Sequence, residues 1–178
     1  MGKIDLMPGD VFATNLGGTL GWLIKKAEAL KSNDCEALYS HTGIILDSKG
    51  TTFEALWTVK NQNLFEAYAG ADVLIARWAC MNEISFQKGY DAVKIQSGHI
   101  YPVARLFLHL FNIGKIHLPN HHMVCSEMTS CFLIYAGART MSGQNPYGVT
   151  PDNHVDEWRI NRDFNIIFEG KLEVTNNG

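Results

Sequence analysis

Short apolar segments, separated by polar, turn-forming residues, dominate the first half of the chain and return near its end. They are rich in β-branched and aromatic residues, which favours strands at 11–14, 41–46, 51–57, 72–78 and 165–168. The polar turn at 47–50 joins two of these segments, so 41–46 and 51–57 are predicted to form a hairpin. Segment 170–174 is predicted to pair with the strand before it.

Apolar residues at helical spacing mark three other segments. The clearest is 126–138, in which one core stripe is predicted from residues at i, i+3, i+4 and i+7: Met128, Cys131, Phe132 and Tyr135. Segments 20–30 and 82–97 are also predicted to be helices. We therefore predict an α+β fold with an antiparallel sheet packed against helices, in a single domain over residues 1–178.

Composition and charge narrow the function. The chain is 46% hydrophobic and 19% charged with a net charge of −3, so no basic excess indicates nucleic-acid binding. Its apolar runs are far shorter than the ~20 residues of a membrane-spanning helix, and residues 1–10 contain no signal-peptide run. We expect a cytoplasmic location, with a phage or host-delivered origin left open. The four cysteines are then free thiols, and their spacing predicts no metal site and no cofactor.

Cys125 is the candidate nucleophile because it precedes the clearest predicted helix. The first turn of a helix has free N–H groups and the positive end of the helix dipole, which favour a thiolate and can bind an oxyanion. The alternative is a buried structural cysteine. Cys131, six residues later on the apolar stripe, is expected to be such a core residue.

His41 and Glu54 lie on the two strands of the predicted hairpin. If the turn centres on residues 48–49, Gly43 faces Glu54, and His41 lies diagonal to Glu54 on one face, roughly 7–8 Å away. The carboxylate would then hold one ring nitrogen and leave the other to take a thiol proton. A register shifted by one residue would move Glu54 to the opposite face. The adjacent pair at 121–122 supplies rival histidines for the base.

Five short motifs occur in an order that resembles a known family. They are Leu-Met-Pro-Gly-Asp-Val at 6–11, Tyr-Ser-His-Thr-Gly-Ile-Ile at 39–45, Phe-Glu-Ala at 53–55, Val-Cys-Ser-Glu at 124–127 and Thr-Pro-Asp at 150–152. This series resembles the YiiX-like branch of the circularly permuted NlpC-type cysteine hydrolases, which have a papain-like fold and a histidine that precedes the cysteine. The resemblance implies that His41 is the base, Glu54 the polar third member and Cys125 the nucleophile. Tyr39 and Ser126, beside two of these residues, are the candidate substrate contacts.

The expected function is hydrolysis of an amide bond, in a peptide, a cell-wall peptide or an N-acyl compound, through a thioester on Cys125. Two alternatives stay open at this point. One is a thiol acyltransferase or lipid acyl hydrolase with the same triad, and the other is a catalytically inactive binding module on this scaffold. The partner is therefore expected to be a small-molecule, peptide or acyl substrate, and the oligomeric state stays open.

Overall fold

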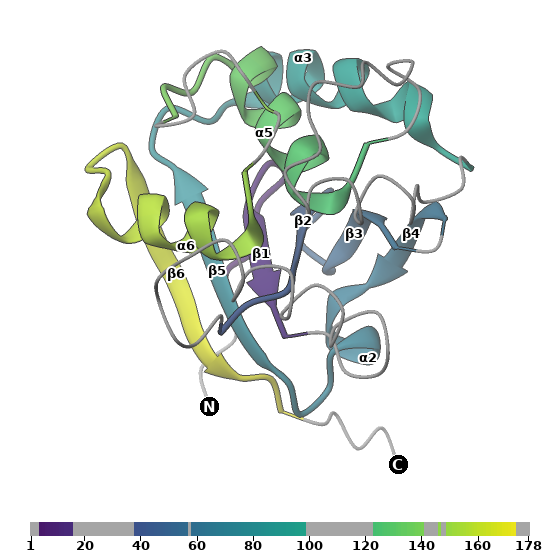
Figure 1. Ribbon diagram of the computed structural model, residues 1–178, viewed down its shortest axis with the longest axis vertical. Helices are drawn as coiled ribbons and strands as arrows, with labels where there is room; N and C mark the ends of the chain where they lie inside the picture. The colour runs from purple at the N-terminus through teal and green to yellow at the C-terminus, as the bar shows by residue number, and fades with distance from the viewer. Residues whose placement is uncertain are drawn as a thin grey trace, which may run out of the picture.

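The protein is built on one antiparallel sheet of six strands. The computed structural model describes residues 4–15, 38–56, 58–98, 123–140, 146 and 149–173. The strand order is β4-β3-β2-β1-β5-β6 (Figure 1). The strands are β1 (Val11–Thr14), β2 (His41–Ile45), β3 (Thr51–Ala55), β4 (Val59–Asn63), β5 (Asp72–Trp78) and β6 (Phe164–Lys171). This sheet and the helices that accompany it confirm the α+β fold with an antiparallel sheet.

The described helices are α2 (Leu64–Ala67), α3 (Glu83–Val93), α5 (Cys125–Ala136) and α6 (Pro151–Ile160), with a 3-10 turn, η1 (Lys94–Gln96), after α3. Figure 1 shows α3 and α5 side by side and α6 next to β6, whereas α2 lies near the other end of the molecule. Gly89 of α3 permits the close approach of α5, because a Cβ there would lie 2.7 Å from the carbonyl oxygen of Phe132.

Alternation along the strands sorts the apolar side chains into two clusters. Val11, Ala13 and Ile44 point toward α5 and α6 and join a first cluster that includes Cys125. Phe12 and Ile45 point the other way and join a second cluster that includes Leu64, at the start of α2, and Tyr68, just after it. Both faces of the central strands are therefore covered.

Helix α5 confirms the predicted helix and most of its core stripe. Met128, Cys131 and Phe132 are buried, as predicted. Tyr135 is 61% exposed, so the prediction that it belongs to the core is wrong. In the last turn the covered side of the helix has moved round to Leu133 and Ala136, before the chain leaves the helix at Gly137 with a positive φ of 102°.

The other differences concern segments with weak patterns. In the described part of the predicted strand 170–174, residues 170–173, there is no separate strand, because β6 continues to Lys171 and pairs along its length with β5. Helix α6 and strand β4 were not predicted, although Thr150 as N-cap followed by Pro151 is a recognised helix start. The predicted helix 82–97 ends earlier, at Val93, and continues as η1. The predicted helix 20–30 lies outside the described residues.

Candidate active site

The β2–β3 hairpin has the register that the sequence predicts. Ile44 pairs with Phe53, so continuing the ladder by one residue sets Gly43 opposite Glu54. A Cβ on Gly43 would lie 2.9 Å from Cγ of Glu54. Glycine therefore leaves the space through which the glutamate reaches His41, and His41 Nε2 lies 2.8 Å from Glu54 Oε2. The predicted pairing of these two side chains is confirmed.

Three side chains donate hydrogen bonds to the Glu54 carboxylate, which is completely buried. His41 and the hydroxyl of Tyr68 donate to Oε2, and the hydroxyl of Thr52 donates to Oε1. Burial acts to raise the pKa of Glu54, but these bonds and the charge of His41 hold that pKa below its usual value. The side chain is therefore a carboxylate.

Sequence reasoning did not find Tyr68 or Thr52. Thr52 lies two residues before Glu54 on the same face of β3, so strand alternation was a usable signal for it. Tyr68 follows α2, a helix of four residues in a segment where no structure was predicted. Its contact with Glu54 depends on the tertiary fold, and the sequence has no local signal for it.

Cys125 is the first residue of α5 and is 3% exposed. Burial acts to raise the pKa of its thiol, but the interaction with His41 and nearby backbone N–H groups together lower that pKa. These N–H groups belong to Thr42 and Ser126. The position at the start of the helix is as predicted, and the Ser126 N–H is one of the helix-start donors that favour a thiolate.

His41 lies between the thiol and the carboxylate. Burial acts to lower its pKa, but Cys125 and Glu54 together raise it to about 9. Because Nε2 is bound to Glu54, Nδ1 is the nitrogen left for the thiol; it is buried and makes no hydrogen bond of normal geometry. We therefore describe the thiol–imidazole contact as a close electrostatic pair. The raised pKa of His41 and the lowered pKa of Cys125 favour a thiolate beside an imidazolium.

The pair sits where the two apolar clusters meet. Cys125 belongs to the first cluster, whereas the rings next to His41, those of Phe12 and Tyr68, belong to the second. A buried hydrogen bond of 3.1 Å from Thr129 to Thr42 ties α5 to β2 beside the pair. The nucleophile helix and the histidine strand are thus joined directly.

Cys131 provides an internal comparison on the same helix. Burial, with a contribution from the charge of Glu127, raises the pKa of its thiol to about 11. It is buried in the first cluster, so the prediction that it is a core residue is confirmed. Cys80 is exposed, and Cys35 lies outside the described residues.

The two candidate substrate contacts, Ser126 and Tyr39, have different surroundings. Ser126 follows Cys125 in the first turn of α5, and its N–H faces the Cys125 sulfur. The hydroxyl of Tyr39 has Glu169 and Arg159 as charged neighbours, and neither the thiol nor His41 is among them. Contact of either side chain with a substrate stays a prediction. The rival histidines at 121–122 lie outside the described residues.

Metal ligands and membrane-spanning helices are two further features that bear on function. No group of three or more His, Cys, Asp or Glu side chains in the described part of the chain is arranged to hold a metal ion. None of the helices described has the length and apolar character that crossing a membrane requires.

Comparisons with known proteins agree with the fold. No family model matches the chain, and no curated protein matches it in sequence. The structure is similar to the crystal structure of the metalloprotein YiiX from Escherichia coli O157:H7. The two chains share 18% identity with a TM-score of 0.64, over 94% of this chain and 99% of that one. This likeness shows a YiiX-like fold.

Proposed function

We propose that this protein is a cysteine hydrolase with Cys125 as nucleophile, His41 as acid–base and Glu54 as the carboxylate that orients the histidine. One observation carries the proposal. A completely buried carboxylate binds Nε2 of His41 at 2.8 Å, and the other nitrogen is left to the thiol at the start of α5. The order of the motifs and the YiiX-like fold support a place among the permuted NlpC-type hydrolases.

The reaction that this geometry supports is acyl transfer to the thiol and then to water. The Cys125 thiolate attacks the acyl carbon of an amide, in a peptide, a cell-wall peptide or an N-acyl compound, and forms a C–S bond. The backbone N–H of Ser126 is placed to stabilise the oxyanion. His41 gives its proton to the departing amine as the C–N bond breaks. Water then attacks the thioester and His41 takes the proton of that water. The C–S bond breaks, the electron pair returns to the Cys125 thiolate, and the carboxylic acid leaves.

Glu54 keeps its charge throughout this cycle. It stabilises the imidazolium and holds Nε2, which leaves Nδ1 for the thiol. Acid–base catalysis of this kind contributes roughly 10²–10⁴-fold to a rate. YiiX is called a metalloprotein, but the residues described in this chain do not assemble a set of metal ligands.

The test is the rate of iodoacetamide alkylation as a function of pH, with each labelled cysteine located by peptide mass mapping. Burial slows the alkylation of Cys125 by a constant factor, so the pH midpoint reports the thiol pKa. We expect a midpoint well below the ordinary value of about 8.5 for Cys125. His41→Ala should slow alkylation at pH 6 by about 100-fold, because the imidazolium that lowers the thiol pKa is lost.

The chain contains its own controls for this test. Cys80 reports an exposed thiol and Cys131 a buried thiol with a raised pKa, and neither should respond to His41→Ala. Hydrolysis of a panel of amides and acyl esters, with Cys125→Ala as the blank, then distinguishes an amidase from an acyl-ester hydrolase. A midpoint near 8.5 for Cys125, or no labelling at all, would remove the basis of the proposal.

A further inference from the structure

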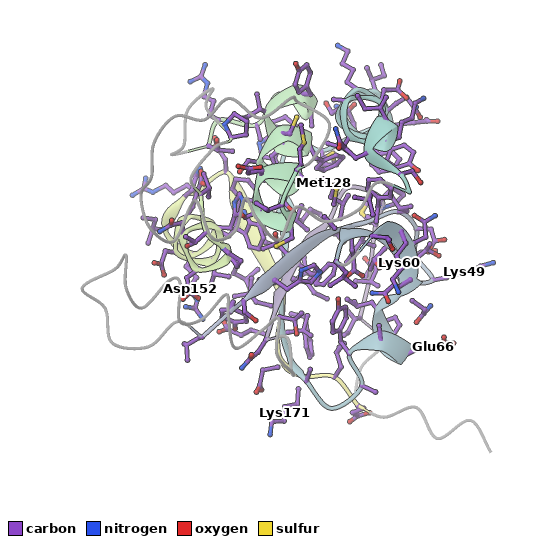
Figure 2. The ribbon with its side chains drawn as sticks, turned by 45° about the vertical axis from the view of Figure 1, so that its right-hand side comes forward. Lys49, Lys60, Glu66, Met128, Asp152 and Lys171 are labelled. Carbon is purple, nitrogen blue, oxygen red and sulfur yellow. The ribbon has the colours of Figure 1, made fainter. Side chains whose placement is uncertain are left out.

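Helix α6 contacts the chain next to both members of the proposed catalytic pair. It packs against α5, which begins with Cys125, and its first turn reaches the residues that precede β2, which begins with His41. Figure 2 shows Asp152 of α6 on the side of the molecule away from Lys49, Lys60 and Glu66. Two polar side chains of α6 make these contacts.

The first is His154, a completely buried histidine that the proposed mechanism does not use. Its Nε2 lies 3.0 Å from the backbone carbonyl oxygen of Ser126 and 3.0 Å from the hydroxyl of Ser130. Because a carbonyl only accepts, Nε2 carries the proton and donates it. The ring also stacks on Trp158, with centroids 5.4 Å apart. His154 thus fixes the residue whose N–H faces the Cys125 sulfur.

The second is Asp152, whose Oδ1 accepts a hydrogen bond of 2.9 Å from the backbone N–H of Tyr39. The N–H of Leu38 is a further donor to this carboxylate. Residues 38–40 lead directly into His41, so this contact fixes the entry of the chain into β2. Both contacts run between a side chain and the backbone, which makes them suited to holding geometry.

We propose that α6 is the positioning element of the catalytic pair, in which His154 holds the first turn of the Cys125 helix and Asp152 holds the approach to His41. Neither residue touches the sulfur or the imidazole of the pair in the contacts above. Each acts through backbone groups of its neighbours. This inference rests on the proposed function, since it assigns the two residues a role in setting the thiolate.

The experiment measures the same alkylation profile of Cys125 in variants of α6. His154→Leu removes the donor to the Ser126 carbonyl and should slow alkylation at pH 6 by about tenfold, because the thiol pKa rises. His154→Gln restores a donor at nearly the position of Nε2 and should return the rate to within about threefold of wild type. Asp152→Ala should also slow alkylation of Cys125, because Asp152 holds the approach to His41.

Val155→Ala is the matched control for a purely structural effect. Val155 is 1% exposed, lies beside His154 on the same helix and has no polar group to give α5. This variant should lower the melting temperature without moving the pH midpoint. If His154 served stability alone, His154→Leu would also lower the melting temperature and leave the pH midpoint unchanged. The midpoint therefore separates a positioning role from a purely structural one.

The outcomes distinguish this inference from the proposed function. An ordinary midpoint in the wild type would overturn both. A low midpoint in the wild type that stays unchanged in folded His154→Leu and Asp152→Ala would overturn the positioning role alone, as would failure of His154→Gln to restore the rate. If His154→Leu does not fold, Asp152→Ala decides, because Asp152 is only half-buried and its removal leaves the core intact.

Discussion

His41 and His154 are both buried completely, yet their surroundings drive their pKa values in opposite directions. Burial alone lowers the pKa of either ring, since it disfavours the imidazolium. His41 has a carboxylate and a thiol as neighbours, and its pKa rises to about 9. His154 has an uncharged carbonyl and hydroxyl as partners, so burial outweighs the opposing effect of the Ser126 carbonyl and the pKa of the ring falls to about 4. The charge of a buried histidine is thus decided by its partners.

The same contrast separates the two roles that we propose. Near neutral pH the surroundings of His41 favour an imidazolium that stabilises a thiolate and can give up a proton. His154 is held neutral in one tautomer, which suits a residue that only donates a hydrogen bond to a backbone carbonyl.

The largest effect is expected in the stability of the protein in acid. His154 binds no proton in the folded state between its pKa of about 4 and the unfolded value of 6.5, whereas the unfolded chain does. Stability therefore rises with pH across this window and is lost as pH falls through it, by up to about 3 kcal/mol. His154→Gln should remove that slope. Urea unfolding of both proteins at pH 7 and pH 4 measures it.

NMR titration of the histidine rings supplies the direct check on this prediction. The His154 signals should titrate near pH 4 in the wild type, and the spectrum of His154→Gln should lack them. An equal acid slope in wild type and His154→Gln would show that the ring does not stay neutral in the folded protein.

The second-largest effect is expected at Glu54, whose negative charge is what distinguishes the surroundings of His41 from those of His154. Glu54→Gln keeps the size of the side chain and an acceptor for His41 but removes the negative charge. The pKa of His41 should fall, the thiolate should lose part of its stabilisation, and alkylation of Cys125 at pH 6 should slow by about 30-fold. Glu66→Gln is the control, because Glu66 is an exposed glutamate on α2 (Figure 2). Unchanged alkylation in Glu54→Gln would show that the charge of Glu54 is not needed.

These residues also show how far the sequence predicts the site. The pairing of His41 with Glu54 follows from a local turn, because the short turn at 47–50 fixes the hairpin register and with it the face of every side chain. The start of α5 at Cys125 follows from a strong apolar pattern. Both are short-range features, and both were predicted.

The residues that support the pair were missed for a physical reason. Tyr68 and His154 reach the site from elements joined to it only through tertiary packing. A lone tyrosine after a four-residue helix belongs to no periodic pattern from which its position could be predicted. Helix α6 did carry a start signal at Thr150 and Pro151, but a Thr-Pro-Asp sequence is equally typical of a turn. Local patterns cannot decide between these, whereas packing of the helix against β6 and α5 does.

The smallest effect is expected at Tyr68, which donates to the same Glu54 oxygen as His41. Tyr68→Phe removes one of three donors, so the pKa of Glu54 should rise while the side chain stays ionised at neutral pH. Because His41 keeps its carboxylate partner, Cys125 alkylation at pH 6 should slow by only about threefold. Tyr90→Phe is the control, since Tyr90 stacks on Phe86 away from the carboxylate. A loss as large as that of Glu54→Gln would mean that Tyr68, more than the charge, holds Glu54 against the histidine.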